Sequence, residues 1–422
     1  MKKTLLFILF IIIQLQNVYS QDTPYKSITY PFVNQSADTI CFFGNAQINF
    51  NNICKSLNQL ILKGSGQIRV LHIGDSHIQA DHFSGRIREN LQSFALGIQG
   101  SRGFIFPYNV AATNNPDNYK VKYTGKWHNC RNVQNINGCQ LGIAGISVTT
   151  IDSNASIQII LNNKNYPHQD FNKIKIFHNV GDTVYQVKLI ENQIISGDYN
   201  LLGYTFFTTD SHFDTLNILL QKTDTLQTNF TLYGIDLDND DPGVICSAVG
   251  VNGAEVSSFL KCNLLESQLK ILNPEWVIIS LGTNDAYGKN FDRNVFENHY
   301  SQLIKRIKNA LPHSFILLTT PADSYRRKRF PNPDMMLAKQ VIIDIAKQNN
   351  CAIWDLHEVM GGYKSMKRWQ SAGLAANDKV HFSKAGYVLQ GDLLFNAFLK
   401  AYDDFIEKSE EGSQKTEVGR PK

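Results

Sequence analysis

The chain has 422 residues, of which 43% are hydrophobic, enough to form two or three domains with well-buried cores. Its formal net charge is +4, and without the two lysines of a short N-terminal leader it is 4 − 2 = +2. This near-neutral charge argues against nucleic acid as the main partner, because nucleic acid is bound through strongly basic surfaces.

Residues 1–20 have the pattern of a secretory signal peptide. Lys2 and Lys3 precede a short apolar run from Leu5 to Ile13, and Ser20 stands before the expected cleavage point. The run is too short to span a bilayer comfortably, although an uncleaved anchor is the alternative. The residue directly after the expected cleavage point is Gln21 and not a cysteine, which argues against a lipid anchor. We expect an exported protein, periplasmic, secreted or held in the cell envelope, without a stable membrane span after cleavage.

The first folded segment that the sequence predicts is a strand followed by a turn and a helix. The strand covers Val70–Ile73, the turn is Gly74-Asp75-Ser76-His77, and the helical pattern runs from Ala80 to Leu96. A serine on such a turn is lifted off the end of a sheet, with its hydroxyl exposed beside the positive end of the helix. Ser76 is therefore a candidate nucleophile, and capping of the helix is its alternative role.

From residue 108 to residue 240 the pattern changes to short runs typical of strands. These runs are rich in Val, Ile, Thr, Tyr and Phe and are broken by Asn, Asp and Gly, without helical spacing. The clearest strands predicted are Ile157–Leu161, Lys173–His178, Val184–Ile190 and Phe230–Leu237. The segment predicts an all-β, sandwich-like module inserted into the chain.

From residue 241 to residue 406 apolar strands again alternate with helices. The predicted strands are Val244–Val249, Trp276–Leu281, Phe315–Thr320 and Ala352–Leu356, and the predicted helices are Val295–Leu311, Met335–Gln348 and Lys384–Ile406. This alternation indicates a parallel sheet covered on both faces. We expect one α/β/α domain, built from residues 21–107 and 241–406 and interrupted by the β module at 108–240. Residues 407–422 are polar and are expected to form a disordered tail.

Residues able to support acyl transfer follow the strands of this sheet, where reactive groups collect at the carboxyl ends. Acyl transfer needs a nucleophile, a base, a group that orients the base, and donors for the oxyanion. His381 could take the proton of Ser76 through Nε2, while Asp378 holds the Nδ1–H. The backbone N–H groups of Ser76 and Gly253 and the side-chain amide of Asn284 could bind the oxyanion. Glycine at position 253 would let the backbone approach the substrate closely.

Four sequence blocks give the chain a resemblance to the SGNH (GDSL-like) hydrolase superfamily. They are Gly74-Asp75-Ser76, Gly253, Gly282-Thr283-Asn284-Asp285 and Asp378-Lys379-Val380-His381, in this order. The Gly-Asp-Ser block alone is a weak motif, but four blocks at strand ends reinforce one another. The resemblance implies a flavodoxin-like three-layer α/β/α fold, with Ser76, Asp378 and His381 as the catalytic triad. It also implies an oxyanion hole that includes Gly253 and Asn284, and a reaction that needs neither a metal nor an organic cofactor.

A narrower resemblance, to bacterial peptidoglycan O-acetylesterases, rests on three features. They are the Gly-Asp-Ser-His sequence, the later Gly100-Ser101-Arg102-Gly103-Phe104, and the β-rich insertion, which in those enzymes is a carbohydrate-binding-like β-sandwich. The resemblance implies an exported serine esterase whose partner is an O-acetylated glycan, with peptidoglycan expected. Two alternatives stay open: an esterase or acyltransferase acting on another polysaccharide or a lipid, and a non-catalytic glycan-binding surface protein. The sequence does not define the oligomeric state.

The cysteines suit an oxidising compartment, in which disulfides form. Cys130–Cys139 is the local bridge that the spacing favours, and Cys41–Cys54 and Cys246–Cys262 are further candidate pairs. The sequence has no Cys-x-x-Cys pair, which disfavours a zinc site.

Three other features have competing interpretations. Asp75-Ser76-His77 is compatible with the Asp-x-His of a two-metal phosphoesterase, but the further His and Asp or Asn ligands of such a site are not recognisable. The basic run Arg326–Arg329 is either a solvated loop or a contact for a carboxylate-bearing glycan. Tyr119, Tyr123 and Trp127 are candidates for stacking on sugars or for packing in the protein.

Overall fold

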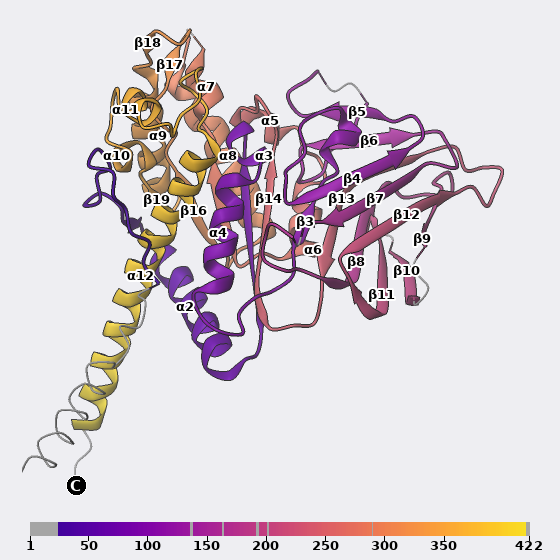
Figure 1. The fold of residues 1–422 in the computed structure, drawn as a ribbon, viewed down its shortest axis with the longest axis horizontal. Coiled ribbons are helices and arrows are strands. Elements are labelled where there is room, and N and C mark those ends of the chain that lie inside the picture. Colours follow the sequence, from indigo (N-terminus) through magenta and orange to yellow (C-terminus); the bar gives the residue numbers. More distant parts are fainter. Residues whose placement is uncertain are drawn as a thin grey trace, which may run out of the picture.

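The computed structural model describes residues 24–135, 138–162, 164–190, 194–200, 202–288 and 290–418. They form two bodies that lie side by side (Figure 1). The α/β body is made of the N-terminal and C-terminal parts of the chain, and the β module is made of the residues between them. The signal peptide expected at residues 1–20 lies outside the described residues.

The elements of the α/β body alternate between strands and helices along the chain. They are β1 (Ile40–Phe42), α2 (Ala46–Lys63), β2 (Gln67–Gly74), α3 (Ser76–Gln79), α4 (His82–Ser93), β14 (Gly243–Gly250), α5 (Val256–Leu260), α6 (Leu265–Leu272), β15 (Trp276–Ser280), α7 (Thr283–Tyr287), α8 (Arg293–Ala310), β16 (Phe315–Thr319), β17 (Tyr325–Arg326), β18 (Phe330–Pro331), α9 (Asp334–Gln348), β19 (Ala352–Trp354), α10 (Leu356–Val359), α11 (Met366–Ser371) and α12 (Lys384–Val418).

The β module is built almost entirely of strands. Its elements are β3 (Gly103–Ile105), the 3₁₀ helix η1 (Tyr108–Ala111), β4 (Tyr119–Thr124), β5 (His128–Arg131), β6 (Ile146–Thr150), β7 (Ser156–Leu161), β8 (Phe171–His178), β9 (Gln186–Leu189), β10 (Ile194–Asn200), β11 (Tyr204–Phe213), β12 (Thr215–Gln221) and β13 (Phe230–Asp238).

The central sheet of the α/β body has the strand order β1-β19-β16-β15-β2-β14. The pairings from β14 through β2, β15 and β16 to β19 are parallel, and β1 joins the edge antiparallel to β19. Numbered as they appear in the chain, the parallel strands run 2-1-3-4-5, which is the flavodoxin-like order. The predicted fold class is confirmed. The strand order reverses between β2 and β15, the point at which such sheets bind ligands beyond their carboxyl ends.

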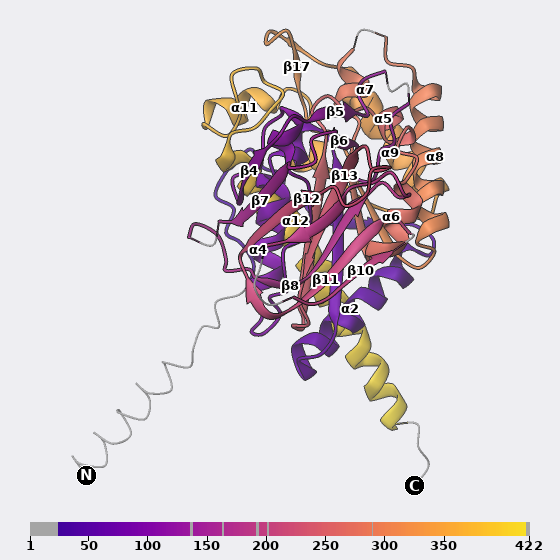
Figure 2. The ribbon, with the colours of Figure 1, turned by 90° about the vertical axis from the view of Figure 1, so that its right-hand side faces the viewer.

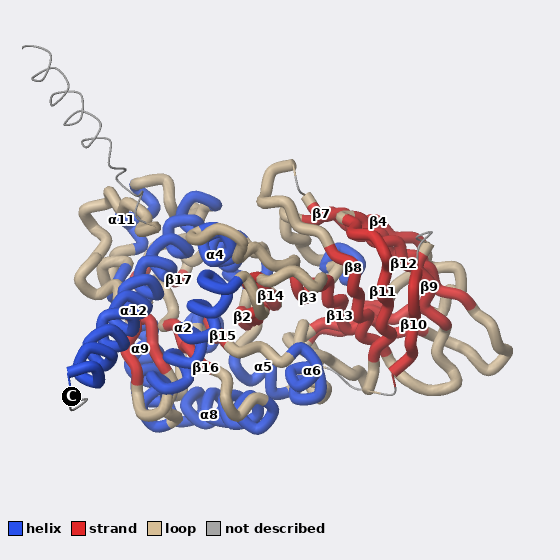
Figure 3. Tube along the Cα trace, turned by 90° about the horizontal axis from the view of Figure 1, so that it is seen from below, coloured by secondary structure: helices blue, strands red, loops and turns tan. Residues whose placement is uncertain are grey.

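Helices cover both faces of this sheet, because its strands are apolar on both sides (Figure 3). Residues of α2, α4 and α12 share one core with Trp276 and Val70, and residues of α5, α6, α8 and α9 share another with Val277 and Leu71. Successive residues of a strand point to opposite faces, so the neighbours Trp276 and Val277 enter different cores.

The β module consists of two antiparallel sheets, as the predicted sandwich-like module requires. Their strand orders are β10-β11-β8-β13-β6-β5, with β3 also paired to β13, and β4-β7-β12-β9. Along β7, buried Ile157, Ile159 and Leu161 alternate with partly exposed residues. The buried residues of the β module form one continuous core with the residues that lie between the central sheet and helices α5, α6, α8 and α9. Figure 2 shows the strands of the module lying across the α/β body.

Two predicted boundaries differ from the structure. β3 begins at Gly103 and pairs with β13, so the β module starts inside the segment assigned to the α/β domain. α12 continues to Val418, so the prediction of a disordered tail is wrong for residues 407–418. The tail is polar, but it contains helix-forming Glu, Lys and Gln, and it has no proline between Glu407 and Pro421. No helix in the described part of the chain is long and apolar enough to cross a membrane.

The predicted disulfide between Cys130 and Cys139 is confirmed. The pairings Cys41–Cys54 and Cys246–Cys262 are wrong, because these four cysteines are free. Cys246 and Cys262 lie in the two different cores, on opposite faces of the central sheet. Cys41 is exposed on the edge strand, whereas Cys54 is buried.

Candidate active site

Ser76 stands at the first position of α3, directly after the turn that ends β2. The turn is held by Asp75, whose Oδ1 accepts a hydrogen bond from the His77 backbone N–H at 2.9 Å. The turn also packs closely on the end of β14. A Cβ on Gly250 would lie 2.4 Å from the backbone nitrogen of Gln79 and 2.5 Å from the backbone carbonyl oxygen of Asp75. Glycine at position 250 therefore allows the nucleophile turn to lie against the loop that follows β14.

The three residues predicted as a triad lie in one hydrogen-bonded line. Ser76 Oγ is 2.9 Å from His381 Nε2, and His381 Nδ1 is 2.7 Å from Asp378 Oδ2. The side chains of His381 and Asp378 are 41% and 40% exposed, so the line opens to solvent. This order of hydroxyl, imidazole and carboxylate is the arrangement in which a histidine can accept the serine proton.

A tight loop before α12 places Asp378 and His381 on the same side. Lys379 has a φ of 56°, which turns the chain so that Asp378 Oδ1 accepts from the backbone N–H groups of Val380 and His381, each at 2.9 Å. Partial burial works to raise the pKa of the Asp378 carboxyl, but hydrogen bonds from His381 and Val380 outweigh it and hold the pKa below its usual value. Asp378 is thus ionised at neutral pH, the state that holds a proton on His381 Nδ1.

The three predicted oxyanion donors all line the same pocket. The backbone N–H groups of Ser76 and Gly253 have no acceptor within the described part of the chain. Gly253 has a φ of 79° and open space where a Cβ would stand, which suits a backbone exposed to a substrate. The Asn284 amide nitrogen already donates to Asp75 Oδ2 at 3.1 Å and to the Ala254 carbonyl at 3.0 Å. Asn284 would therefore have to share or release one of these bonds to reach an oxyanion.

The triad opens into a cavity of about 680 Å³. Its walls come from the ends of β2, β14 and β15, from the loop before α12, and from Asn114 of the β module. Small-molecule sites commonly have volumes of about 300–1,000 Å³. The pocket is thus large enough for much more than the acyl group that reacts with Ser76.

His77 lies directly behind the triad. It is partly buried, its Nδ1 is 2.9 Å from the Tyr387 hydroxyl, and its ring centroid is 5.2 Å from that of His381. Burial, together with the charge of His381, lowers the pKa of His77 to about 3, so His77 is neutral at physiological pH. This placement makes His77 a support for His381 and argues against the alternative in which Asp75-Ser76-His77 ligates two metal ions. Sequence reasoning did not identify Tyr387, which belongs to none of the four blocks.

Two carboxylates, buried Asp75 and partly buried Asp285, lie beside the site without joining the triad. Burial raises the pKa of Asp75 to about 7, although the His77 N–H and the charge of His381 favour the ionised form. Burial likewise raises the pKa of Asp285 to about 7, against a hydrogen bond from the Val256 N–H. Neither carboxylate is hydrogen-bonded to the His381 ring, so Asp378 is the acid that orients the base.

The remaining residues singled out in the sequence have mainly structural contacts. Arg326 pairs with Asp334 and donates to the carbonyls of Tyr287 and Ala286, so it is not part of a freely solvated run. Tyr119 is buried, and its hydroxyl donates to the Phe106 carbonyl.

The other two aromatic residues considered for sugar stacking differ in exposure. Trp127 is partly buried against the core, and its Nε1 donates to the Thr124 carbonyl. Tyr123 is 45% exposed. Neither of them lines the pocket at Ser76.

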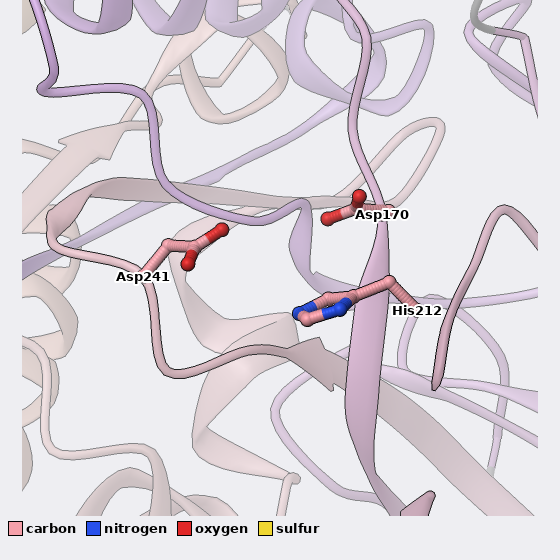
Figure 4. A group of neighbouring side chains, drawn as sticks. All are labelled: Asp170, His212 and Asp241. Carbon is pink, nitrogen blue, oxygen red and sulfur yellow. The ribbon is translucent and has the colours of Figure 1, made fainter. Parts of the chain in front are cut away.

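A separate group of side chains has a spacing suited to a metal ion. Asp170, His212 and Asp241 each offer a ligand atom within 4.8 Å of the others (Figure 4). Asp241 precedes β14, whereas Ser76 follows the neighbouring parallel strand β2, so the group and the triad lie at opposite ends of these strands. His212 and Asp241 are exposed, and we assign the group no part in the chemistry at Ser76.

Comparisons with known proteins agree with this fold. Residues 225–389 match the model of the GDSL-like lipase/acylhydrolase family, a range that includes Gly253, Asn284, Asp378 and His381. Ser76 lies outside it, because the β module separates the nucleophile block from the other three. No curated protein matches the sequence.

One solved structure extends the likeness to most of the chain. A peptidoglycan O-acetylesterase superposes with a TM-score of 0.71 at 23% identity, over 86% of this chain and 99% of that one. An acetylxylan esterase from Geobacillus stearothermophilus covers 38% of this chain and 73% of its own, at 26% identity and a TM-score of 0.29.

The fold and the arrangement of Ser76, His381 and Asp378 resemble those of SGNH-type ester hydrolases. The overall architecture, β module included, resembles that of the peptidoglycan O-acetylesterase, and at 23% identity this likeness concerns the fold.

Proposed function

We propose that this protein is an exported serine esterase that removes O-acetyl groups from peptidoglycan. The observation that carries the proposal is the hydrogen-bonded line from Asp378 through His381 to Ser76 at the mouth of an open pocket. Two further points support the choice of substrate. The shared fold spans nearly all of a peptidoglycan O-acetylesterase, and the sequence begins with a secretory signal pattern that suits a substrate outside the cytoplasm.

In the first half of the reaction, Ser76 Oγ attacks the acetyl carbonyl carbon while His381 Nε2 takes the hydroxyl proton. The negative charge that develops on the carbonyl oxygen is stabilised by the free N–H groups of Ser76 and Gly253, with Asn284 as a third donor. The C–O bond to the sugar then breaks, and His381 returns its proton to the departing sugar oxygen. The products of this half are the free sugar hydroxyl and an acetyl ester on Ser76.

In the second half, water replaces the sugar. His381 Nε2 removes a proton from the water molecule as its oxygen attacks the acetyl ester, and the proton then passes to Ser76 Oγ as acetate leaves. Asp378, held ionised by its hydrogen bonds, stabilises the imidazolium in both halves. The residues named here account for both proton transfers.

The test is acetate release from three substrates: O-acetylated peptidoglycan, acetylated xylan and a small chromogenic acetate ester. We expect the highest kcat/KM on peptidoglycan. We expect Ser76→Ala to lower turnover on every substrate by roughly 10⁴–10⁶-fold, since loss of a triad nucleophile removes the covalent step. The unchanged melting temperature of Ser76→Ala would show that the loss is chemical.

Other outcomes would redirect the assignment. A preference for xylan would refute peptidoglycan as the substrate while keeping the esterase. Hydrolysis of none of the three esters would favour a glycan-binding protein. Turnover that survives Ser76→Ala but is abolished by a chelator would refute the serine mechanism.

A further inference from the structure

The β module reaches into the active-site pocket through one loop. The loop connects η1 to β4, and its residue Asn114 lines the same pocket as Ser76 and His381. Asn114 belongs to none of the sequence blocks that carry the chemistry. It is nevertheless the one residue between 103 and 238 that lines this pocket among those described.

The carbonyl end of the Asn114 side chain is held by two donors from the α/β body. Its Oδ1 accepts from Gln79 Nε2 at 2.9 Å and from Asn252 Nδ2 at 2.6 Å. Gln79 is buried, and it also donates to the Asn114 backbone carbonyl at 2.9 Å. Two donors use the two lone pairs of the amide oxygen, so the plane of the Asn114 amide is fixed.

Fixing the oxygen also fixes the nitrogen, which lies on the opposite side of the amide. Asn114 is exposed at the pocket, and its Nδ2 has no acceptor among the described residues. The two N–H groups on Nδ2 are therefore free to donate to a molecule in the pocket. Gln79, which holds Asn114, is the last residue of the helix α3 whose first residue is Ser76. Asn114 is therefore joined to the candidate nucleophile through one short helix.

The rest of the loop is docked as firmly as Asn114. Asp117 Oδ2 accepts from Lys384 Nζ at 2.8 Å, and Asn118 Nδ2 donates to buried Asp81 at 2.6 Å. Lys384 also lines the pocket, but its charge is offset by Asp117. The loop thus offers the pocket a neutral donor held in place before binding, which limits the entropy lost on binding.

We propose that Asn114 is a specificity residue, whose amide N–H groups bind an acceptor oxygen of the glycan outside the ester that is cleaved. This proposal rests on the proposed function and deepens it. A pocket of about 680 Å³ holds sugar units as well as an acetyl group, and sugar hydroxyl, ring and N-acyl oxygens are acceptors for such a donor. A small acetate ester lacks these oxygens and cannot use Asn114.

Two variants test the proposal. Asn114→Asp keeps an oxygen for Gln79 and Asn252 but replaces the donor nitrogen with an acceptor, and Asn114→Ala removes both. The quantity to measure is the ratio of kcat/KM on the acetylated glycan to kcat/KM on the small chromogenic acetate ester. This ratio is independent of the fraction of enzyme that has folded. We expect it to fall roughly 3–10-fold for Asn114→Ala, as for one lost hydrogen bond, and further for Asn114→Asp, mainly through KM.

The matched control is Asn154→Asp, which makes the same chemical change at an exposed turn of the β module outside the pocket. We expect the ratio to be unchanged in this control. The proposal is overturned if both Asn114 variants keep the wild-type ratio, or if both substrates lose activity equally, which would indicate a purely structural role.

Failure of the proposed function gives a different result. If the wild type cleaves acetylated xylan and not peptidoglycan, the proposed substrate is wrong, and the same ratio measured on xylan decides the role of Asn114. If the wild type cleaves the small ester and neither glycan, the glycan-binding role of Asn114 is overturned together with the proposed function.

Discussion

The α/β body and the β module supply the same pocket in different ways. In the α/β body, Ser76, Gly253 and Asn284 come directly after β2, β14 and β15, and the parallel register brings these strand ends together. The β module supplies Asn114 from a loop, held by side chains far away in the sequence. The chemistry is thus placed by topology, whereas the contact from the module depends on individual side-chain hydrogen bonds. The contributions of the two bodies to stability can be measured separately. The variants below change the junction between the bodies, the β module and the α/β body in turn.

The largest loss of stability is expected at the junction between the two bodies, where Asp81 is buried between Arg88 and Arg102. Both Asp81 oxygens are 3.0 Å from Arg88 Nη2, Oδ2 is 2.8 Å from Arg102 Nη2, and Asn118 of the module donates to the same oxygen. Asp81→Ala would leave two buried guanidinium groups without their partner. We expect the free energy of unfolding to fall by about 3–5 kcal/mol, measured by denaturant titration.

A surface pair provides the control for this change. Asp344→Ala removes the partner of Arg293, whose side chain is 56% exposed, and should cost less than about 1 kcal/mol. A single unfolding transition for Asp81→Ala would indicate that the bodies unfold together, as their shared core suggests. A module that melts first, while small-ester turnover persists, would contradict that view.

The second effect is confined to the module. The disulfide Cys130–Cys139 closes a short loop, with a sequence separation of 9. For a loop of this length the chain-entropy model gives about 2–3 kcal/mol of stabilisation. The double variant Cys130→Ser/Cys139→Ser should lose that amount, which thermal melting with and without reductant would measure, since only the wild type should respond to reductant. If the variant also lost small-ester turnover at temperatures where it is folded, the bodies would be more strongly coupled than the disulfide's position in the module indicates.

The same contrast explains what the sequence could predict. The positions of Ser76, Asp378 and His381 were predictable because local motifs mark strand ends, and the alternation of strands and helices defines where those ends meet. The roles of Gln79 and Asn252 in holding Asn114 were not predictable, since the contacting residues are 35 and 138 positions apart and follow no period.

The remaining failures have similar causes. The edge strand β1 is only three residues long and carries little pattern, so the sequence did not reveal it. The pairing Cys246–Cys262 looked plausible by spacing alone, but a residue of β14 and a residue of the turn between α5 and α6 can be near in sequence while lying on opposite faces of the sheet. The polar composition of residues 407–418 is typical of a tail, but the same Glu, Lys and Gln residues also favour a helix, and α12 continues through them.

The smallest effect is expected inside the α/β body, at Asp285. Its side chain is partly buried, and this burial raises the pKa of the carboxyl to about 7. An aspartate in the unfolded chain has a pKa near 3.9. Between these two values the native state binds the proton more tightly than the unfolded state. Stability from this group is therefore lost as pH rises from about 4 to about 7.

Asp285→Asn removes the titration and keeps an oxygen for the Val256 N–H, which the wild type bonds at 3.2 Å. The limit for one group is about 1.4 kcal/mol per pH unit, and nearby Asp75, which also has a raised pKa, shares the protonation. We therefore expect the variant to gain roughly 1–2 kcal/mol relative to wild type between pH 5 and pH 7, measured by denaturant titration at both values. Asp344→Asn, at a partly exposed carboxylate, should show no such gain. Equal pH dependence in wild type and Asp285→Asn would mean that Asp285 is already ionised in the native state. The proton bound between pH 5 and pH 7 would then have to be assigned to Asp75, whose pKa is also raised and which bonds the backbone N–H of His77.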